Sequence, residues 1–180
     1  MNAPRWLTVG GSAVAIASAG VMAFLAHWED GGRRQAEHVV YADKLAGGLP
    51  TACNGITKWT SPVPVVVGDV WSQEKCDEIG AQIVETTQRE LAKCLKVAVP
   101  QPVFDALTSH AHNFGYGDTC GSLAVSAINR GEIARGCDLL AWTPEGRPNW
   151  ASVGCPDCKF IQGLHNRRLS ERRLCRQGVE

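Results

Sequence analysis

The segment YADKLAGGLPTACNGIT, residues 41–57, decides how this chain folds. Its apolar residues do not recur every three or four positions, as a helix would require, and three glycines interrupt it. Short runs separated by glycines are typical of strands joined by tight turns. The segment therefore predicts a small hairpin that contains the carboxylate of Asp43 and the hydroxyl of Thr51.

The sequence changes character at Ser72. Residues 37–70 are rich in Gly, Pro, Val and Thr and predict short strands and loops, and we expect no other β structure. Ser72 is a suitable helix N-cap, and apolar residues then recur at helical spacing as far as Cys94. The same spacing predicts further helices within residues 103–114, 123–128, 133–141 and 160–176. The expected fold class is α+β, with a small β lobe followed by a mainly helical lobe.

Composition and charge exclude one class of partner. The chain has 180 residues, of which 44% are hydrophobic, so it can bury a core of its own. Its formal net charge of +0 gives no long-range field that would attract nucleic acid. We therefore expect a monomer that does not bind nucleic acid.

The cysteines indicate an oxidising compartment. All eight follow residue 52, and they are Cys53, Cys76, Cys94, Cys120, Cys137, Cys155, Cys158 and Cys175. An even number at wide spacing favours a disulfide framework over a zinc site, although the spacing does not choose among the pairings. The CPDC motif at residues 155–158 has no second CxxC to complete a zinc knuckle, so bridges are expected there too.

The N-terminal segment is long and apolar. Residues 6–28, WLTVGGSAVAIASAGVMAFLAHW, contain no charge unless His27 is protonated, and this length can span a bilayer. Gly, Ala and Ser make up about half of the segment, so its insertion should be marginal and reversible. We therefore divide the chain into a membrane segment, residues 1–28, and a domain, residues 29–180. A cleavable signal peptide is the alternative, because AIA and ASA resemble cleavage sites.

Glu29 lies where the apolar run ends, directly after Trp28. A carboxyl group against aromatic and apolar surface resists ionisation and can donate a proton near neutral pH. Asp43 would supply a second, charged carboxylate, and Thr51 a hydroxyl that holds a water. A protonated and an ionised carboxyl on either side of a bond are the equipment for glycoside hydrolysis.

Several motifs together resemble the phage-type lysozymes of glycoside hydrolase family 24. A Glu after an aromatic residue is followed by YAD, a Gly-rich turn and PTACNGIT, and later by VVVGDVWSQEKC, FDALTSHAHNFGYG and GLHNRRLSERRLC in the family's order. The resemblance covers residues 28–176 and implies a lysozyme-like fold. PTACNGIT and the C-terminal motif are its most distinctive parts.

The resemblance also implies roles for three residues. Glu29 matches the general acid, Asp43 the carboxylate that stabilises positive charge or orients water, and Thr51 the hydroxyl that positions water. Thirteen residues separate Glu29 from Asp43 and seven separate Asp43 from Thr51, and both gaps exceed those usual in the family. Glu37 is the alternative acid, but it lies too close to Asp43 and follows no aromatic residue.

The activity implied by the resemblance is that of a phage endolysin. Such an enzyme would be a muramidase that hydrolyses the β-1,4 bond between N-acetylmuramic acid and N-acetylglucosamine in peptidoglycan for host lysis. It would need no metal and no organic cofactor. The N-terminal run resembles a signal-arrest-release segment, which tethers such enzymes to the inner membrane and later escapes. We therefore expect membrane tethering through residues 6–28, followed by release into the periplasm and packing of the former anchor on the domain.

Two other classes stay open from the residues alone. Cys53 with His110 or His112 would suit a cell-wall amidase or endopeptidase. A disulfide-rich, membrane-tethered binding module would need no Glu29. The arginines of the C-terminal motif are expected to form a solvated, ion-paired helix face or to contact anionic wall or lipid.

Overall fold

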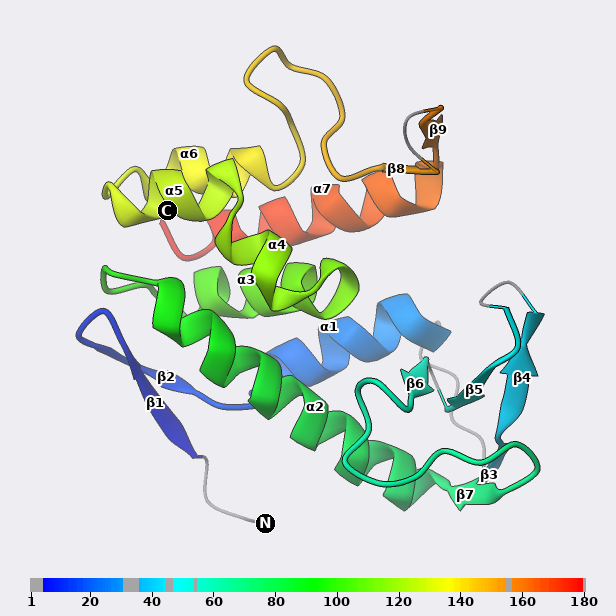
Figure 1. The fold of residues 1–180 in the computed structure, drawn as a ribbon. Helices are drawn as coiled ribbons and strands as arrows, with labels where there is room; N and C mark the ends of the chain where they lie inside the picture. The colour runs from blue at the N-terminus through cyan, green and yellow to red at the C-terminus, as the bar shows by residue number, and fades with distance from the viewer. Residues whose placement is uncertain (1–4, 31–35, 45–46, 54, 155–156, 180) are drawn as a thin grey trace. The chain divides into compact units, whose positions relative to one another are not determined.

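The computed structural model describes residues 5–30, 36–44, 47–53, 55–154 and 157–179, and the side chain of Asp30 is not described. The chain forms two compact units (Figure 1). Unit 1 consists of Met1–Val21 together with Thr87–Glu180, and unit 2 is Met22–Thr86. Helices α1 and α2 each contribute residues to both units.

Unit 2 contains the small β structure that the sequence predicts. Strand β3 pairs antiparallel with β7, and β4, β5 and β6 form an antiparallel sheet in that order. The strands are β3 (Glu37–Val39), β4 (Tyr41–Asp43), β5 (Leu49–Ala52), β6 (Ile56–Thr57) and β7 (Val70–Ser72). Trp71 is the largest buried side chain in the small core of this unit, which also includes side chains from the connecting segments and from residues 76 and 79.

Helix α2 (Gln73–Cys94) begins where the sequence predicts it. The hydroxyl of Ser72 accepts a hydrogen bond from the Lys75 N–H at 3.3 Å, which satisfies one of the backbone donors that a helix N-terminus leaves unpaired. The N-cap expected from the sequence is therefore confirmed.

Unit 1 is mainly helical, also as expected. Phe104, Leu107, Ile128 and Leu140 are fully buried in its core. Gly136 packs so closely on α5 that a Cβ there would lie 2.4 Å from Ile128 Cγ1. The helices that complete this unit are α3 (Gln101–Phe114), α4 (Tyr116–Cys120), α5 (Leu123–Asn129), α6 (Ile133–Leu139) and α7 (Gln162–Arg176).

The expected membrane-spanning helix over residues 6–28 is not present in the structure. A hairpin of β1 (Trp6–Val9) and β2 (Ser12–Ala15) is followed by the twelve-residue helix α1 (Ala19–Asp30). No helix in the described part of the chain has both the length and the apolar character needed to cross a bilayer. The hairpin forms because Gly10 and Gly11 adopt positive φ angles of 53° and 98° in the two-residue turn between Val9 and Ser12.

A second short hairpin also lies outside the region where we expected β structure. Strand β8 (Ser152–Val153) pairs with β9 (Lys159–Phe160) in unit 1. A strand is predicted from apolar and polar side chains that alternate over at least four residues. Strands of two residues are too short to show this alternation. The prediction that residues 37–70 hold all the β structure is therefore wrong.

The disulfide framework is confirmed. Three bridges are described, Cys53–Cys76 in unit 2, and Cys94–Cys120 and Cys137–Cys175 in unit 1, and Cys158 is also disulfide-bonded. Cys155 lies outside the described residues.

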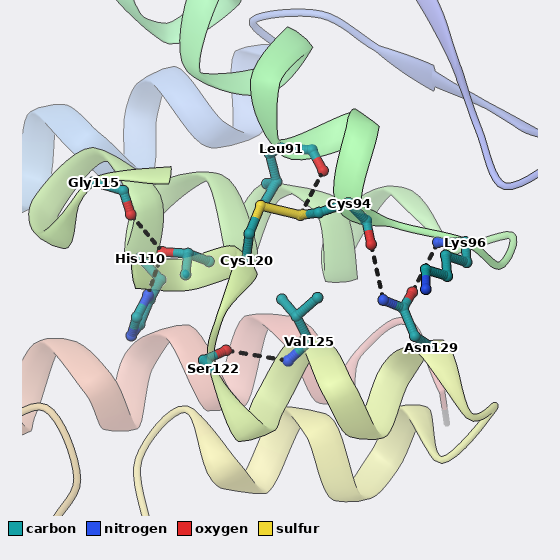
Figure 2. Close-up of a disulfide and its surroundings, with 10 residues drawn as sticks. Leu91, Cys94, Lys96, His110, Gly115, Cys120, Ser122, Val125 and Asn129 are labelled. Carbon is teal, nitrogen blue, oxygen red and sulfur yellow. Dashed lines mark hydrogen bonds between the residues drawn. A yellow bond between two sulfur atoms is a disulfide. The ribbon is translucent and has the colours of Figure 1, made fainter. Parts of the chain in front are cut away.

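The Cys94–Cys120 bridge joins the end of α2 to the end of α4 (Figure 2). Beside it, Asn129 donates to the Cys94 carbonyl at 2.8 Å and accepts from the Lys96 N–H at 2.8 Å.

Candidate active site

The register of β4 and β5 brings two of the three predicted site residues onto one surface. Tyr41 is opposite Thr51, and Asp43 is opposite Leu49. Side chains directly opposite each other in an antiparallel pair point to the same face of the sheet, and so do residues two apart on one strand. Asp43 and Thr51 therefore share a face as diagonal neighbours, at a typical Cβ separation of about 7 Å.

The Thr51 hydroxyl is oriented for accepting a hydrogen bond. Thr51 is only 3% exposed, and its Oγ1 donates to the Leu49 carbonyl at 3.1 Å. A hydroxyl has one donor and two acceptor lone pairs, so a Thr51 Oγ1 that donates to the backbone still accepts from a water molecule. This is the hydrogen-bonding geometry that a water-positioning threonine needs.

Glycines and a disulfide shape the two ends of β5. Before the strand, Gly47 and Gly48 have φ angles of 66° and 83°, and the Gly48 N–H donates to the Asp43 carbonyl at 2.7 Å. These angles favour glycine because it has no Cβ. After the strand, Cys53 has a φ of 49° and is bonded to Cys76 of α2. The strand that carries Thr51 is thus fixed at both ends.

Glu29 lies in the last turn of α1, and its side chain is exposed. The preceding Trp28 is half-buried and packs against Phe24 and His27, with ring-centroid distances of 6.5 and 5.4 Å. The aromatic neighbour expected from the sequence is therefore present, whereas the side chain of Glu29 itself is in contact with solvent.

All three predicted site residues, and the alternative acid Glu37, belong to unit 2. Glu37 is exposed at the start of β3, where it is paired with Ser72 of β7. Asp43 and Thr51 lie instead on the β4-β5-β6 sheet. Glu37 therefore belongs to a different sheet from the two residues with which it would have to cooperate.

The cysteine-based alternative loses its nucleophile. Cys53 is in a disulfide with Cys76, so it offers no thiolate for peptide or amide cleavage. His38 lies within 4.8 Å of both sulfur atoms, but the same disulfide removes them as metal ligands. The His38 Nε2 is 3.0 Å from Gln73 Oε1, so the His38 ring forms a hydrogen bond that joins β3 to the start of α2.

A buried ionic cluster in unit 1 was missed by the sequence analysis, which expected a solvated basic face on the C-terminal helix. Arg168 and Glu171 are fully buried and form an ion pair of 2.6 Å, and Ser109 donates to the same Glu171 oxygen at 2.7 Å. The Arg168 guanidinium also lies 4.7 Å from the centre of the Phe114 ring. Helical spacing within α7 gives a signal for the Arg168–Glu171 pair, but its burial depends on α3, which lies elsewhere in the sequence.

Burial governs the titration of this cluster. It raises the pKa of the Glu171 carboxyl, an effect that Arg168 opposes, and it lowers the pKa of Arg168 to about 10. Burial and the positive charges of Arg168 and Arg167 lower the pKa of His110 to about 3. His110 is therefore neutral at physiological pH, and its Nδ1 is 2.8 Å from the Thr119 hydroxyl (Figure 2). A buried His110 with a pKa of about 3 is too weak a base to take a proton from a thiol.

A small antiparallel sheet in one unit and a mainly helical second unit form the lysozyme-like α+β fold that the sequence motifs imply. The family model described as phage lysozyme matches residues 32–171, which include Asp43 and Thr51 and begin just after Glu29. The chain belongs to the phage lysozyme family.

Relatives and solved structures agree with this membership. The chain is 28% identical to the SAR-endolysin of Enterobacteria phage P21 over 96% of its own length and 93% of that protein. It is 29% identical to the SAR-endolysin of Bacteriophage PS119 over 96% and 92%. Among solved structures, the fold is similar to a P22 lysozyme mutant (TM-score 0.69, 23% identity, 91% and 97% coverage). It is also similar to the muramidase domain of SpmX from Asticaccaulis excentricus (TM-score 0.70, 18% identity, 88% and 95% coverage).

The protein is therefore a phage endolysin of the lysozyme type. It is a muramidase that hydrolyses the glycan strands of peptidoglycan. The prediction from the sequence motifs is confirmed for fold, family and reaction class.

Proposed function

We propose that Glu29 is the general acid of this muramidase, that Asp43 stabilises the positive charge that develops on the sugar, and that Thr51 positions the attacking water. The observation that carries the proposal is the β4-β5 register, which puts Asp43 and Thr51 on one face of the sheet. Glu29 belongs to the same unit and follows an aromatic residue.

The three groups divide the reaction between them. The Glu29 carboxyl donates its proton to the glycosidic oxygen as the bond to the anomeric carbon breaks. The Asp43 carboxylate then faces an oxocarbenium-like transition state, which negative charge stabilises. The Thr51 hydroxyl accepts a hydrogen bond from the water that attacks the anomeric carbon. The water's oxygen becomes the new hydroxyl at the reducing end, and its proton leaves to a carboxylate.

Substitutions of Thr51 and Asp43 test these roles. Thr51→Val removes the hydroxyl at nearly constant volume, and Thr51→Ser keeps it. We expect kcat, measured as new reducing ends from purified peptidoglycan, to fall about a hundredfold in Thr51→Val and in Asp43→Asn, and only severalfold in Thr51→Ser. Equal activity of Thr51→Val and Thr51→Ser would remove the water-positioning role.

We also propose that residues 6–28 tether the enzyme to the inner membrane before release, and that the hairpin and α1 are the released form of this segment. Two features support the proposal: the apolar sequence of the segment, and the name SAR-endolysin carried by the relatives. In this account, residues 1–28 are an uncleaved anchor and the enzyme acts in the periplasm after release.

The hairpin of the released form packs through a complementary surface on unit 1. Val9 and Val14 are fully buried in the helical core. A Cβ at Gly10 would lie 1.9 Å from the Val97 carbonyl carbon, so only glycine permits this approach. The Ser12 hydroxyl donates to the Val99 carbonyl at 3.0 Å and accepts from the Val99 N–H at 3.1 Å.

Polar side chains of α2 and α3 form hydrogen bonds with backbone N–H and carbonyl groups at the end of the hairpin and directly after it. Gln101 accepts from the Ala15 N–H at 2.6 Å and donates to the Ala15 carbonyl at 3.1 Å. Gln88 accepts from the Ala17 N–H at 2.8 Å. Backbone groups buried without such partners would cost several kcal/mol in total, at about 1 to 3 kcal/mol each. These contacts favour the released form over a segment left in lipid.

The hairpin offers matched variants for the membrane proposal. Thr8 and Ala13 are exposed and opposite each other, so Thr8→Leu with Ala13→Leu makes the segment more apolar without disturbing its packed face. We expect this double variant to stay longer in the membrane fraction of expressing cells than the wild type. Thr8→Ser with Ala13→Ser is the control and should leave the membrane faster. Equal partition of both variants would contradict the proposal.

A further inference from the structure

The side chain of Trp59 is the most exposed of the large apolar side chains in the described part of the chain, at 77%. Tryptophan usually buries most of its large ring, so a ring left in solvent is available to a ligand. A tight turn fixes its backbone: the Trp59 N–H donates to the Thr57 hydroxyl at 3.3 Å, and the Thr57 carbonyl accepts from the Thr60 and Ser61 N–H groups at 3.1 and 2.9 Å.

Trp59 is close to the catalytic face of the sheet. Thr57 of β6 is opposite Thr51 of β5, and Thr51 is opposite Tyr41 of β4. Tyr41, Thr51 and Thr57 therefore form one row across the three strands on the same face. Trp59 follows two residues after the end of this row, which places its Cα within about 7 Å of the Thr57 Cα. That distance corresponds to one or two saccharide units.

A cation accompanies the ring. The Lys58 Nζ lies 4.5 Å from the centre of the Trp59 ring, and no carboxylate among the described residues pairs with it. An ammonium near an exposed ring is held by a cation–π interaction and keeps its remaining donors for an anion. The pair thus presents an apolar plane and a positive charge side by side.

We propose that Trp59 and Lys58 form a binding site for a saccharide unit of peptidoglycan that carries its stem peptide. The apolar C–H face of a pyranose ring packs against the indole plane, and a carboxylate of the stem peptide pairs with the Lys58 ammonium. The proposal rests on the assignment of Thr51 to the active site, because the strand register places Trp59 relative to that residue.

Charge complementarity favours this occupant over a purely apolar partner. Exposed valines also lie in this unit, namely Val39, Val63, Val66, Val67 and Val70, and alone they would suit any apolar partner. An apolar partner would gain nothing from Lys58, whereas a glycan strand bearing carboxylates uses both members of the pair. The glycan is also the substrate of the adjacent residues.

The test measures kcat and KM separately on two substrates. The substrates are purified peptidoglycan and the same peptidoglycan after chemical amidation of the carboxylates of its stem peptides. The variants are Trp59→Ala, Trp59→Phe and Lys58→Gln, and Trp6→Ala is the control because Trp6 is 61% exposed but belongs to unit 1. Reducing ends report activity, and thermal unfolding confirms that each variant folds.

Trp59→Ala is expected to raise KM about tenfold on both substrates with kcat nearly unchanged, as fits the loss of one aromatic contact. Trp59→Phe should recover most of this loss, and Lys58→Gln should raise KM only on peptidoglycan whose stem-peptide carboxylates are free. Trp6→Ala should have no effect.

Unchanged KM in Trp59→Ala overturns the proposal, and so does an equal rise in Trp6→Ala. Loss of binding to anionic vesicles in Trp59→Ala without a change in KM assigns the surface to lipid instead and also overturns it. Failure of the active-site assignment is a separate outcome, because it shows as full kcat in Thr51→Val whatever the KM of the Trp59 variants.

Discussion

The two units of this enzyme differ in how they use their residues. Unit 1 buries an ion pair, a neutral histidine and a large apolar core, and it contains two described disulfides. Unit 2 has a core of a few side chains, one described disulfide and an exposed tryptophan, yet it contains all three proposed catalytic residues. Stability is concentrated in unit 1, and the proposed chemistry lies in unit 2.

This difference predicts which substitutions affect stability and which affect catalysis. Substitutions in unit 1 should lower the free energy of unfolding and leave the activity of the folded enzyme intact. Substitutions on the β4-β5-β6 sheet should lower the activity and change the free energy of unfolding little.

The largest stability effect is expected at the buried ion pair. Glu171→Gln leaves the Arg168 charge buried without its partner, which should lower the free energy of unfolding by about 3 to 5 kcal/mol. Chemical denaturation gives this value. The double variant Arg168→Met with Glu171→Leu removes both charges of this pair and should recover part of the loss, because buried Arg167, which lies 3.4 Å from Glu171, also loses this contact. A double variant as unstable as the single one would show that packing, and not the unpaired charge, sets the cost.

Removal of a disulfide should have different effects in the two units, and these effects should be the next largest. Cys137→Ala with Cys175→Ala opens a bridge between residues 38 apart and should cost about 2 to 4 kcal/mol of unfolding free energy, with kcat of the folded enzyme unchanged. Cys53→Ala with Cys76→Ala should lower kcat on peptidoglycan as well, because Cys53 ends the strand that carries Thr51. If both pairs affect only stability, the bridge in unit 2 has no positioning role.

His110 should make the enzyme sensitive to acid. Its pKa is about 3 in the folded protein and near 6.5 when unfolded, so between these values the unfolded state binds the extra proton. Stability from this group is present above pH 6.5 and is lost as the pH falls towards 3, at up to about 1.4 kcal/mol per pH unit. His110→Phe should flatten the dependence of unfolding free energy on pH over this range. An unchanged slope would mean that His110 does not titrate as described.

The smallest effect is expected at Ser18. Its hydroxyl accepts from the Val21 N–H at 3.0 Å as the N-cap of α1 and donates to Asp105 at 2.8 Å. Ser18→Ala should cost about 1 kcal/mol of unfolding free energy, and Ser18→Asn less, because asparagine also caps helices well. Equal losses in both variants would assign the effect to the Asp105 contact instead of the cap.

Local sequence patterns predicted most of the fold. Helical spacing from Ser72 to Cys94 and the turn glycines at 47 and 48 are signals contained within one element, and the structure agrees with both. Asp43 and Thr51 were also identified from motifs, and the strand register brings them onto one face. The catalytic roles of Glu29, Asp43 and Thr51 remain predictions, and Glu29 also precedes the family match, which begins at residue 32.

The remaining features depend on partners distant in the sequence. The burial of Arg168 requires α3, and the choice of Cys137 for Cys175 requires α6 to lie beside α7. The N-terminal hairpin shows a different limit: Gly10-Gly11 between two short apolar runs is a hairpin signal, but the apolar length of residues 6–28 also fits a bilayer. The same residues therefore suit both a hairpin packed in the protein and a helix in a bilayer, and the sequence pattern alone does not distinguish these two structures.

The most direct test of the central claim compares Glu29→Gln with Glu37→Gln. Both residues are exposed glutamates of unit 2, so neither substitution should change the free energy of unfolding by more than about 0.5 kcal/mol. Release of reducing ends from purified peptidoglycan should fall by a factor of about 1,000 or more in Glu29→Gln and stay near wild type in Glu37→Gln. Full activity in Glu29→Gln would contradict the account, and its loss in Glu37→Gln instead would move the general acid to β3.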